Sequence, residues 1–161
     1  MINDFFLVLY WWFLVFVIGL IFFPLTRKIL GGFFDQGYAF TKTVGILIVT
    51  YFVWILGSFN LAPFTFATII ALLILSVIIN LLVLKTSDNS LLRKKLPLFF
   101  LEEILFFVIL LFWSFIRGYQ PDIQGLEKFM DFGFVNSILR SRFFPPLDLW
   151  LSGKTINYYY F

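Results

Sequence analysis

The sequence predicts an all-α integral membrane protein, with about four transmembrane helices followed by an outer loop that contains a short interfacial helix. Three observations lead to this fold class. Hydrophobic residues make up 61% of the 161 residues. Charged residues make up only 13%, whereas about a quarter is usual in soluble domains. Four apolar runs also approach or reach the roughly 20 residues that a helix needs to cross a bilayer.

The four expected spans cover residues 5–23, 40–59, 62–84 and 96–117. The first run ends at Pro24. We reject a signal peptide because Asp4 replaces the basic start, the run is too long, and no small-residue cleavage site follows. A "GSFNLAP" turn separates the second and third spans, and Pro97 suits the first turn of the fourth. Residues 1–117 therefore form the membrane part, and residues 118–161 form the outer loop.

Basic residues in two connections predict the orientation. One connection follows the first span, and the other precedes the fourth. By the positive-inside rule both are cytoplasmic, so the N-terminus and the loop 118–161 lie on the extracytoplasmic side of the cell membrane. The basic residues concerned are Arg27, Lys28, Lys42, Lys85, Arg93, Lys94 and Lys95.

The composition excludes several kinds of chemistry. Cysteine and histidine are both absent, which rules out disulfides, thiolate or imidazole metal sites and the Ser-His-Asp triad. The sequence has no basic stripe that would indicate a nucleic acid partner. Carboxylates, hydroxyls, backbone groups or a cation held by oxygen ligands remain. We assign no metal ligands, and a divalent cation stays open as a cofactor.

Glu102 and Glu103 lie side by side in the cytoplasmic half of the fourth span. A charged side chain at the centre of a span costs roughly 2.5–3.5 kcal/mol on insertion scales. One interpretation is a proton relay or ion path. The other is a hydrogen bond to a neighbouring helix, with Asn80 of the third span as a candidate partner. Either way, we expect at least one of the two glutamates to be protonated or hydrogen-bonded.

The outer loop begins with a predicted helix over residues 124–140. Its apolar positions surround the helix, which is typical of a helix that is buried or lies in the membrane interface. Glu127 and Asp131 share one face at a spacing of four. Two carboxylates held together suggest a cation, a shared proton or a substrate hydroxyl. The alternative is a solvated face on which Lys128 neutralises Asp131.

The "FFPPLDLW" stretch and the end of the chain differ from this helix. Two prolines stiffen an extended segment, which places Asp148 on a rigid approach and Trp150 at the membrane surface as an anchor. A ring with a wet hydroxyl suits a membrane junction, so we expect the chain to return to the bilayer at its tyrosine run. The run consists of Tyr158, Tyr159 and Tyr160.

Four motifs together resemble the YYY membrane protein family, a multi-pass family of archaea and some bacteria. They are "DQGYAFTKTVG", "EKFMDFGFVNSILRS", "FPPLDLWLSG" and "NYYYF". One departure is Leu149, where the resemblance implies a proline after the aspartate of the PPxD segment. Family members are much longer, so the chain is expected to be an N-terminal fragment that is inactive by itself.

The family in turn resembles the GT-C class of glycosyltransferases, which use lipid-linked sugars. This resemblance implies an acidic catalytic residue in an outer loop near the bilayer, and Asp131 matches that position. It also implies a polyprenyl-phosphate sugar as substrate. Sugar transfer needs positive charge against the lipid phosphate, which Arg140 or Arg142 can supply. The other implied substrate-binding residues are Glu127, Asp148, Tyr158, Tyr159 and Tyr160. A transporter or channel that uses Glu102 and Glu103, and a non-catalytic membrane scaffold, remain the alternatives.

Overall fold

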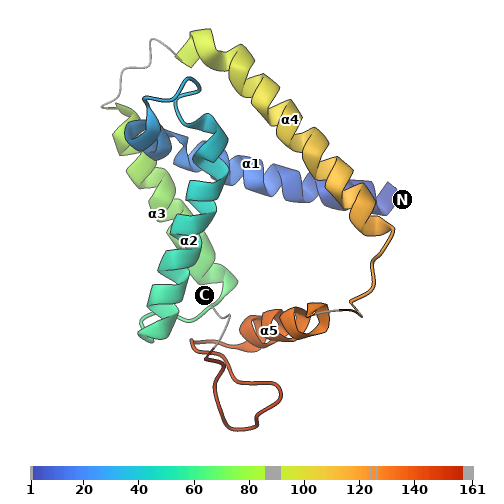
Figure 1. Cartoon of the computed structure of the whole chain (residues 1–161). Coiled ribbons are helices and arrows are strands. Elements are labelled where there is room, and N and C mark those ends of the chain that lie inside the picture. Colours follow the sequence, from blue (N-terminus) through green and yellow to red (C-terminus); the bar gives the residue numbers. More distant parts are fainter. Residues whose placement is uncertain (1, 86–91, 124, 126, 158–161) are drawn as a thin grey trace. The chain divides into compact units, whose positions relative to one another are not determined.

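The computed structural model of the chain describes residues 2–85, 92–123, 125 and 127–157. Within these residues every regular element is helical, and extended pairing is limited to an isolated bridge between Leu147 and Thr155. Four helices, α1 to α4, are long and apolar enough to cross a membrane, which confirms the predicted fold class. The α-helices, labelled in Figure 1, are α1 (Ile2–Leu30), α2 (Thr41–Ser58), α3 (Phe66–Lys85), α4 (Leu92–Gly118) and α5 (Lys128–Arg140). A short 3-10 helix, η1 (Tyr38–Phe40), directly precedes α2.

The first helix does not end at Pro24, because α1 continues to Leu30. The Asn80 side chain of α3 supplies the physical reason: its Oδ1 accepts the backbone N–H of Leu25 at 3.0 Å. A proline disturbs the backbone hydrogen bonds beside it, and membrane helices tolerate this where a neighbour satisfies the freed groups. The fourth helix likewise begins before its proline, so Pro97 lies in the second turn and not the first.

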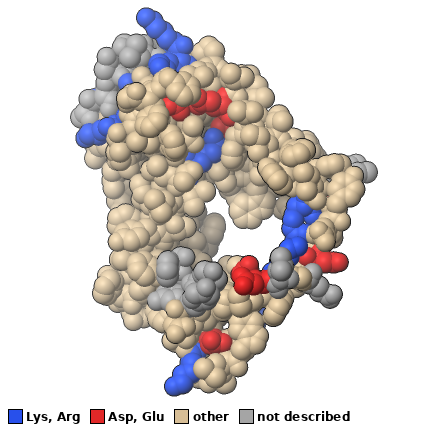
Figure 2. Space-filling model, viewed as in Figure 1, with Lys and Arg blue, Asp and Glu red and all other residues tan. Residues whose placement is uncertain are grey.

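The chain forms two compact units, which we describe separately. The first contains residues 1–47 and 75–120, and the second contains residues 48–74 and 121–161. Both α2 and α3 contribute residues to each unit. The face in Figure 2 is mostly uncharged, and its Lys, Arg, Asp and Glu side chains gather at a few places. Apolar surface of this kind suits contact with lipid.

In the first unit, small residues bring α1 and the start of α2 together. A Cβ atom added at Gly45 would lie 2.6 Å from Cγ2 of Ile18 and 2.9 Å from Cδ2 of Phe22. A Cβ atom added at Gly19 would lie 3.0 Å from Cγ of Lys42. Small residues let membrane helices approach closely. Here they let the stem of Lys42 pack directly against α1.

In the second unit, the turn between α2 and α3 is tied to the segment that follows α5. Phe144 donates its backbone N–H to the carbonyl of Gly57 at 3.3 Å. Phe64 donates its backbone N–H to the carbonyl of Arg142 at 2.7 Å. The turn and this segment therefore lie next to each other.

The α5 helix begins at Lys128, four residues later than the predicted start. Phe134 and Ser137 face the rest of the unit and are buried. Several large apolar side chains on the helix are more than half exposed, which favours the interfacial interpretation over the buried one. These side chains are Phe129, Phe132, Val135 and Leu139.

Candidate functional site

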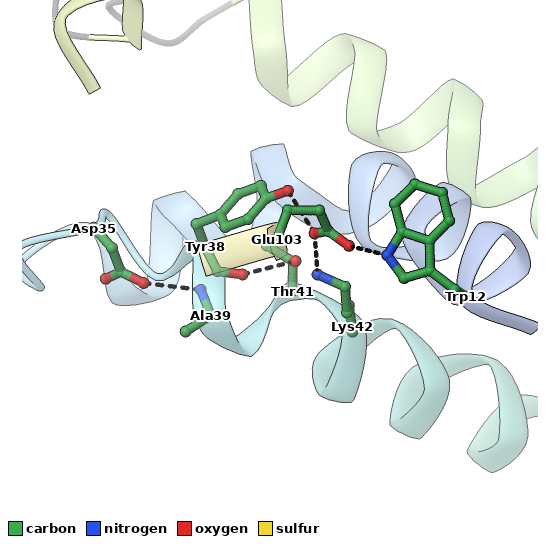
Figure 3. A network of polar contacts seen from close by, with 7 residues as sticks. All are labelled: Trp12, Asp35, Tyr38, Ala39, Thr41, Lys42 and Glu103. Atoms are coloured by element: carbon green, nitrogen blue, oxygen red, sulfur yellow. Dashed lines mark hydrogen bonds and ion pairs between the residues drawn. The ribbon is translucent and has the colours of Figure 1, made fainter. Parts of the chain in front are cut away.

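Glu103 of α4 is the centre of a buried polar cluster in the first unit (Figure 3). Its Oε1 accepts the indole N–H of Trp12 in α1 at 2.8 Å. Its Oε2 accepts the hydroxyl of Tyr38 in η1 at 3.0 Å and the ammonium of Lys42 in α2 at 2.6 Å. Glu103 and Lys42 are each 8% exposed. One carboxylate thus joins four helical elements, and we call Trp12, Tyr38, Lys42 and Glu103 the polar cluster.

Lys42 is enclosed by one carboxylate and two aromatic rings. Besides its ion pair with Glu103, its Nζ lies 5.2 Å from the ring centroid of Tyr38 and 4.8 Å from that of Phe106. Both distances suit cation–π attraction, which operates within about 6 Å. Lys42 is the second residue of α2, so the prediction that it belongs to the connection before that helix is wrong. Its charge can be buried because Glu103 opposes it.

A tight turn before α2 brings Tyr38 and Lys42 to Glu103. The buried carboxylate of Asp35 accepts the backbone N–H groups of Gly37 at 3.0 Å and Ala39 at 2.8 Å, as an N-cap does. Gly37 has a φ of 79°, a conformation that glycine adopts without steric cost. Figure 3 shows that this turn leads directly into the residues that contact Glu103.

Glu102 has a different environment from its neighbour. Its Oε2 is buried and has no hydrogen-bond partner in the part of the chain that the structure describes. Asn80, which is the predicted partner of the glutamates, instead accepts from Leu25 of α1 and donates to the carbonyl of Ser76 at 2.9 Å. That predicted partnership is wrong, because Asn80 completes the backbone of α1 beside Pro24.

The geometry of the polar cluster suits a structural clamp. Both oxygens of Glu103 accept hydrogen bonds, as expected for a glutamate at this depth, and one partner is a cation. Such a network is stable only when its members are satisfied together, and it then holds the elements that supply them. A relay group must exchange its proton during the cycle, which would break the ion pair with Lys42. The arrangement therefore favours the structural interpretation of Glu103.

In the second unit, the segment 147–150 separates two pockets. Leu147 and Leu149 line one pocket, whereas Asp148 and Trp150 line the other. One pocket, of about 400 Å³, is called the arginine pocket, and its lining includes Ser137, Arg140, Arg142, Phe143, Leu147 and Leu149. The other, of about 440 Å³, is called the aromatic pocket, and its lining includes Phe129, Phe134, Asp148, Trp150, Ile156 and Asn157.

The arginine pocket combines positive charge with apolar walls. Arg140 ends α5 and Arg142 follows two residues later, and both are exposed. Neither forms an ion pair with a carboxylate of the described residues. The hydroxyl of Ser137 donates to the carbonyl of Leu147, which fixes the helix against the opposite wall. The pocket thus offers two guanidinium groups to an anion.

Asp148 holds the loop that carries Trp150 in place. Its Oδ1 accepts the backbone N–H groups of Trp150 at 2.8 Å and Leu151 at 3.0 Å. Its own N–H donates to the carbonyl of Lys154 at 2.9 Å, which closes the loop. The indole of Trp150 then packs edge-on against Phe134, with ring centroids 5.4 Å apart and planes at 84°. The carboxylate has both a structural role and a place at the aromatic pocket.

The remaining predicted site residues are spread over the tail. Asp131 lies exposed in the first turn of α5, and it is not among the residues that line either pocket. Glu127 directly precedes the helix, and its carbonyl accepts the N–H of Asp131 at 2.9 Å. Within the described residues, Lys128 makes no ion pair with Asp131, so the predicted neutralisation is not seen. Tyr158, Tyr159 and Tyr160 lie outside the described residues.

Three members of the polar cluster were not predicted as partners of Glu103, namely Trp12, Tyr38 and Lys42. One signal in the sequence points to Lys42: it is a cation inside the expected span 40–59, while the expected span 96–117 holds two carboxylates. Opposite charges at membrane depth tend to pair. No comparable signal distinguishes Trp12 from the other aromatic residues of the first span.

Residues 48–161 match a protein family described as uncharacterized membrane protein (DUF2298). No curated protein and no solved structure matches the chain. The matched region contains α4 and the whole tail with both pockets, whereas α1 and the Asp35 turn lie before it.

Proposed function

The chain belongs to the family described as uncharacterized membrane protein (DUF2298), and from this premise we propose that it is a GT-C-like glycosyltransferase that uses a lipid-linked sugar donor. The tail on the extracytoplasmic side is the substrate site, and the spans with their polar cluster are its support. The arginine pocket is the observation that carries this proposal. It places two guanidinium groups, which have no acidic partner among the described residues, beside two exposed leucines.

A prenyl phosphate has the chemistry that this pocket matches. Arg140 and Arg142 present planar forks of donors that suit phosphate oxygens. Leu147 is 64% exposed and Leu149 is 47% exposed, so an apolar chain entering beside the phosphate has side chains to contact. A small soluble anion would contact only the arginines, whereas an amphipathic ligand would contact both the arginines and the exposed leucines.

Asp131 is the catalytic residue of the proposal. Its carboxylate is exposed and accepts the proton of the acceptor hydroxyl as a general base. The acceptor oxygen forms a bond to the anomeric carbon while the bond from that carbon to the phosphate oxygen breaks. The electron pair leaves on the phosphate, where the two arginines stabilise the charge. Among the described residues, no three Asp or Glu side chains come together in a way that could hold a metal ion.

A sugar-transfer assay with the full-length protein in liposomes tests the proposal. The donor is radiolabelled polyprenyl-phosphate mannose or glucose. We expect Asp131→Asn to abolish transfer, because it keeps the shape and removes the base. Asp122→Asn, a matched change at another exposed carboxylate of the tail, should leave transfer intact. Transfer at the normal rate by Asp131→Asn, or an absence of transfer by the unmodified protein, contradicts the proposal.

The arginines have a separate readout. Arg140→Gln combined with Arg142→Gln should raise the donor KM at least tenfold, because ground-state contacts to the phosphate are lost. Lys154→Gln removes another exposed cation of the tail and serves as the control. An equal effect of the control would mean that general positive charge, and not the arginine pocket, attracts the donor.

One observation favours transport as a second candidate function. The buried Oε2 of Glu102 lacks a hydrogen-bond partner among the described residues. Such an oxygen is available to bind and release a proton, as a proton-transporting carboxyl group must. Proton flux into liposomes, followed with an internal pH dye, tests this candidate. Flux that Glu102→Gln abolishes would support transport, whereas an equal flux in the variant would leave the side chain without a transport role.

A further inference from the structure

We propose that the aromatic pocket binds a pyranose ring, the uncharged and polyhydroxylated part of a glycosyl substrate. The inference rests on the proposed function, and it assigns a ligand class to a pocket whose lining does not include Asp131, Arg140 or Arg142. A volume of about 440 Å³ falls within the roughly 300–1,000 Å³ that is usual for small-molecule sites. The ligand class follows from the aromatic wall, the polar groups and the charge of the pocket.

Trp150 supplies a rigid aromatic surface at the pocket. Trp150 is 56% exposed, although an edge-to-face contact with Phe134 holds its indole. The helix also approaches the ring closely, because a Cβ atom added at Gly133 would lie 2.9 Å from Cη2 of Trp150. Aromatic faces carry negative partial charge and attract the weakly positive C–H groups that one face of a sugar ring presents. A ring that is both fixed and accessible needs little ordering when a ligand stacks on it.

Asp148 and Asn157 supply polar groups at the same pocket. Oδ1 of Asp148 is occupied by two backbone N–H groups, which set the direction of the carboxylate. Oδ2 has no partner in the described part of the chain and can accept hydrogen bonds from hydroxyls. The exposed Asn157 amide can both donate and accept. A sugar ring with several hydroxyls matches this combination of an apolar face and acceptors at its edge.

The charge of the pocket argues against an anionic ligand. Its lining contains Asp148 and no basic residue. Arg140 and Arg142 line the arginine pocket on the other side of the segment 147–150. The alternation of side chains thus separates a site for an anion from a site for a neutral polyol, and a phosphate would be repelled from the aromatic pocket.

Saturation-transfer NMR with methyl mannoside and methyl glucoside, on the full-length protein in lipid nanodiscs, tests the inference. We expect Trp150→Leu to weaken glycoside binding at least tenfold. Asp148→Asn keeps an oxygen for the two backbone N–H groups, and it should weaken binding while the loop stays folded. Trp113→Leu removes another exposed indole, on α4, and should have no effect.

The same variants show whether the bound sugar ring belongs to the donor or to the acceptor. If Trp150→Leu weakens binding of polyprenyl-phosphate mannose but not of polyprenyl phosphate, the ring belongs to the donor. If it weakens binding of the free glycoside alone, the ring belongs to the acceptor. Both outcomes support the inference. Absence of glycoside binding by the unmodified protein, or binding by Trp150→Leu within twofold of normal, overturns it.

Failure of this inference can be told apart from failure of the proposed function. Transfer that persists in Asp131→Asn, together with glycoside binding that depends on Trp150, would remove the catalytic assignment and keep the sugar site. Transfer that depends on Asp131, together with glycoside binding that ignores Trp150, would remove the sugar site and keep the transferase.

Discussion

The ion pair between Lys42 and Glu103 offers the most direct test of the polar cluster. Lys42→Met leaves a carboxylate that is 8% exposed with only the neutral donors of Trp12 and Tyr38. Glu103→Gln leaves the buried ammonium with an amide and two ring faces. Removing one partner of a buried pair costs about 3–5 kcal/mol. Each remaining group keeps its neutral partners in the polar cluster, so we expect the lower end, about 3 kcal/mol, for each variant.

The double variant Lys42→Met with Glu103→Gln should be no less stable than either single variant. It contains no unpaired charge, and the glutamine oxygen can still accept from Trp12 or Tyr38. Replacing both members of a buried pair by groups of similar volume is often neutral or even stabilising. Two single losses of about 3 kcal/mol and a double loss of at most about 3 kcal/mol give a coupling energy of at least about 3 kcal/mol. That value lies at the upper end for contacting residues.

Reversible unfolding in mixed micelles, with increasing SDS, measures all the free energies of this cycle. Trp12→Phe is an internal reference, since one hydrogen bond in a membrane protein contributes about 0.6 kcal/mol on average. Lys94→Met removes an exposed cation of α4 and should leave the free energy of unfolding unchanged. If the single losses simply add in the double variant, or if each is below about 1 kcal/mol, the clamp interpretation of the polar cluster is wrong.

Three further predictions follow from the packing and the orientation. Gly45→Ala should lower the free energy of unfolding by about 1–3 kcal/mol, because the added methyl group overpacks against Ile18. Gly118→Ala should not lower it, because no atom lies within 4 Å of a Cβ atom added there. Equal free energies for the two variants would refute the close contact between α1 and α2. Asn80→Leu should cost about 1 kcal/mol in the same assay, because an N–H beside Pro24 loses its acceptor, and an unchanged stability would show that this bond is dispensable. Asn60→Cys should react with an impermeant outside reagent and Lys94→Cys should not, since the positive-inside rule places them on opposite sides; the reverse labelling would invert the topology.

The membrane class and the four long helices could be predicted from the sequence because they depend on local properties. A bilayer requires every backbone group to be satisfied within the segment, so an apolar run of sufficient length becomes a helix whatever surrounds it. The two prolines of the tail were expected to lie in an extended segment outside any helix, and α5 ends before them at Arg140. The helix ends were less predictable. The end of α1 depends on Asn80, which lies 55 residues from Leu25 in the chain.

Only the tertiary structure decided which polar groups meet. Lys42 and Glu103 are 61 residues apart, and the periodicity around either residue carries no information about the other. The sequence by itself determined that two carboxylates lie inside the fourth span, but the prediction placed Lys42 in a connection, away from Glu103. The pairing of Lys42 with Glu103 depends on close contact between α1 and α2 at Gly19 and Gly45, and on the turn that Asp35 caps. The two tail pockets likewise depend on which side of the segment 147–150 each side chain takes once the Oδ1 atom of Asp148 has fixed the loop. Hydrogen bonds and packing between segments that are distant in the sequence set these side-chain directions. The pattern of residues along one segment therefore does not reveal them.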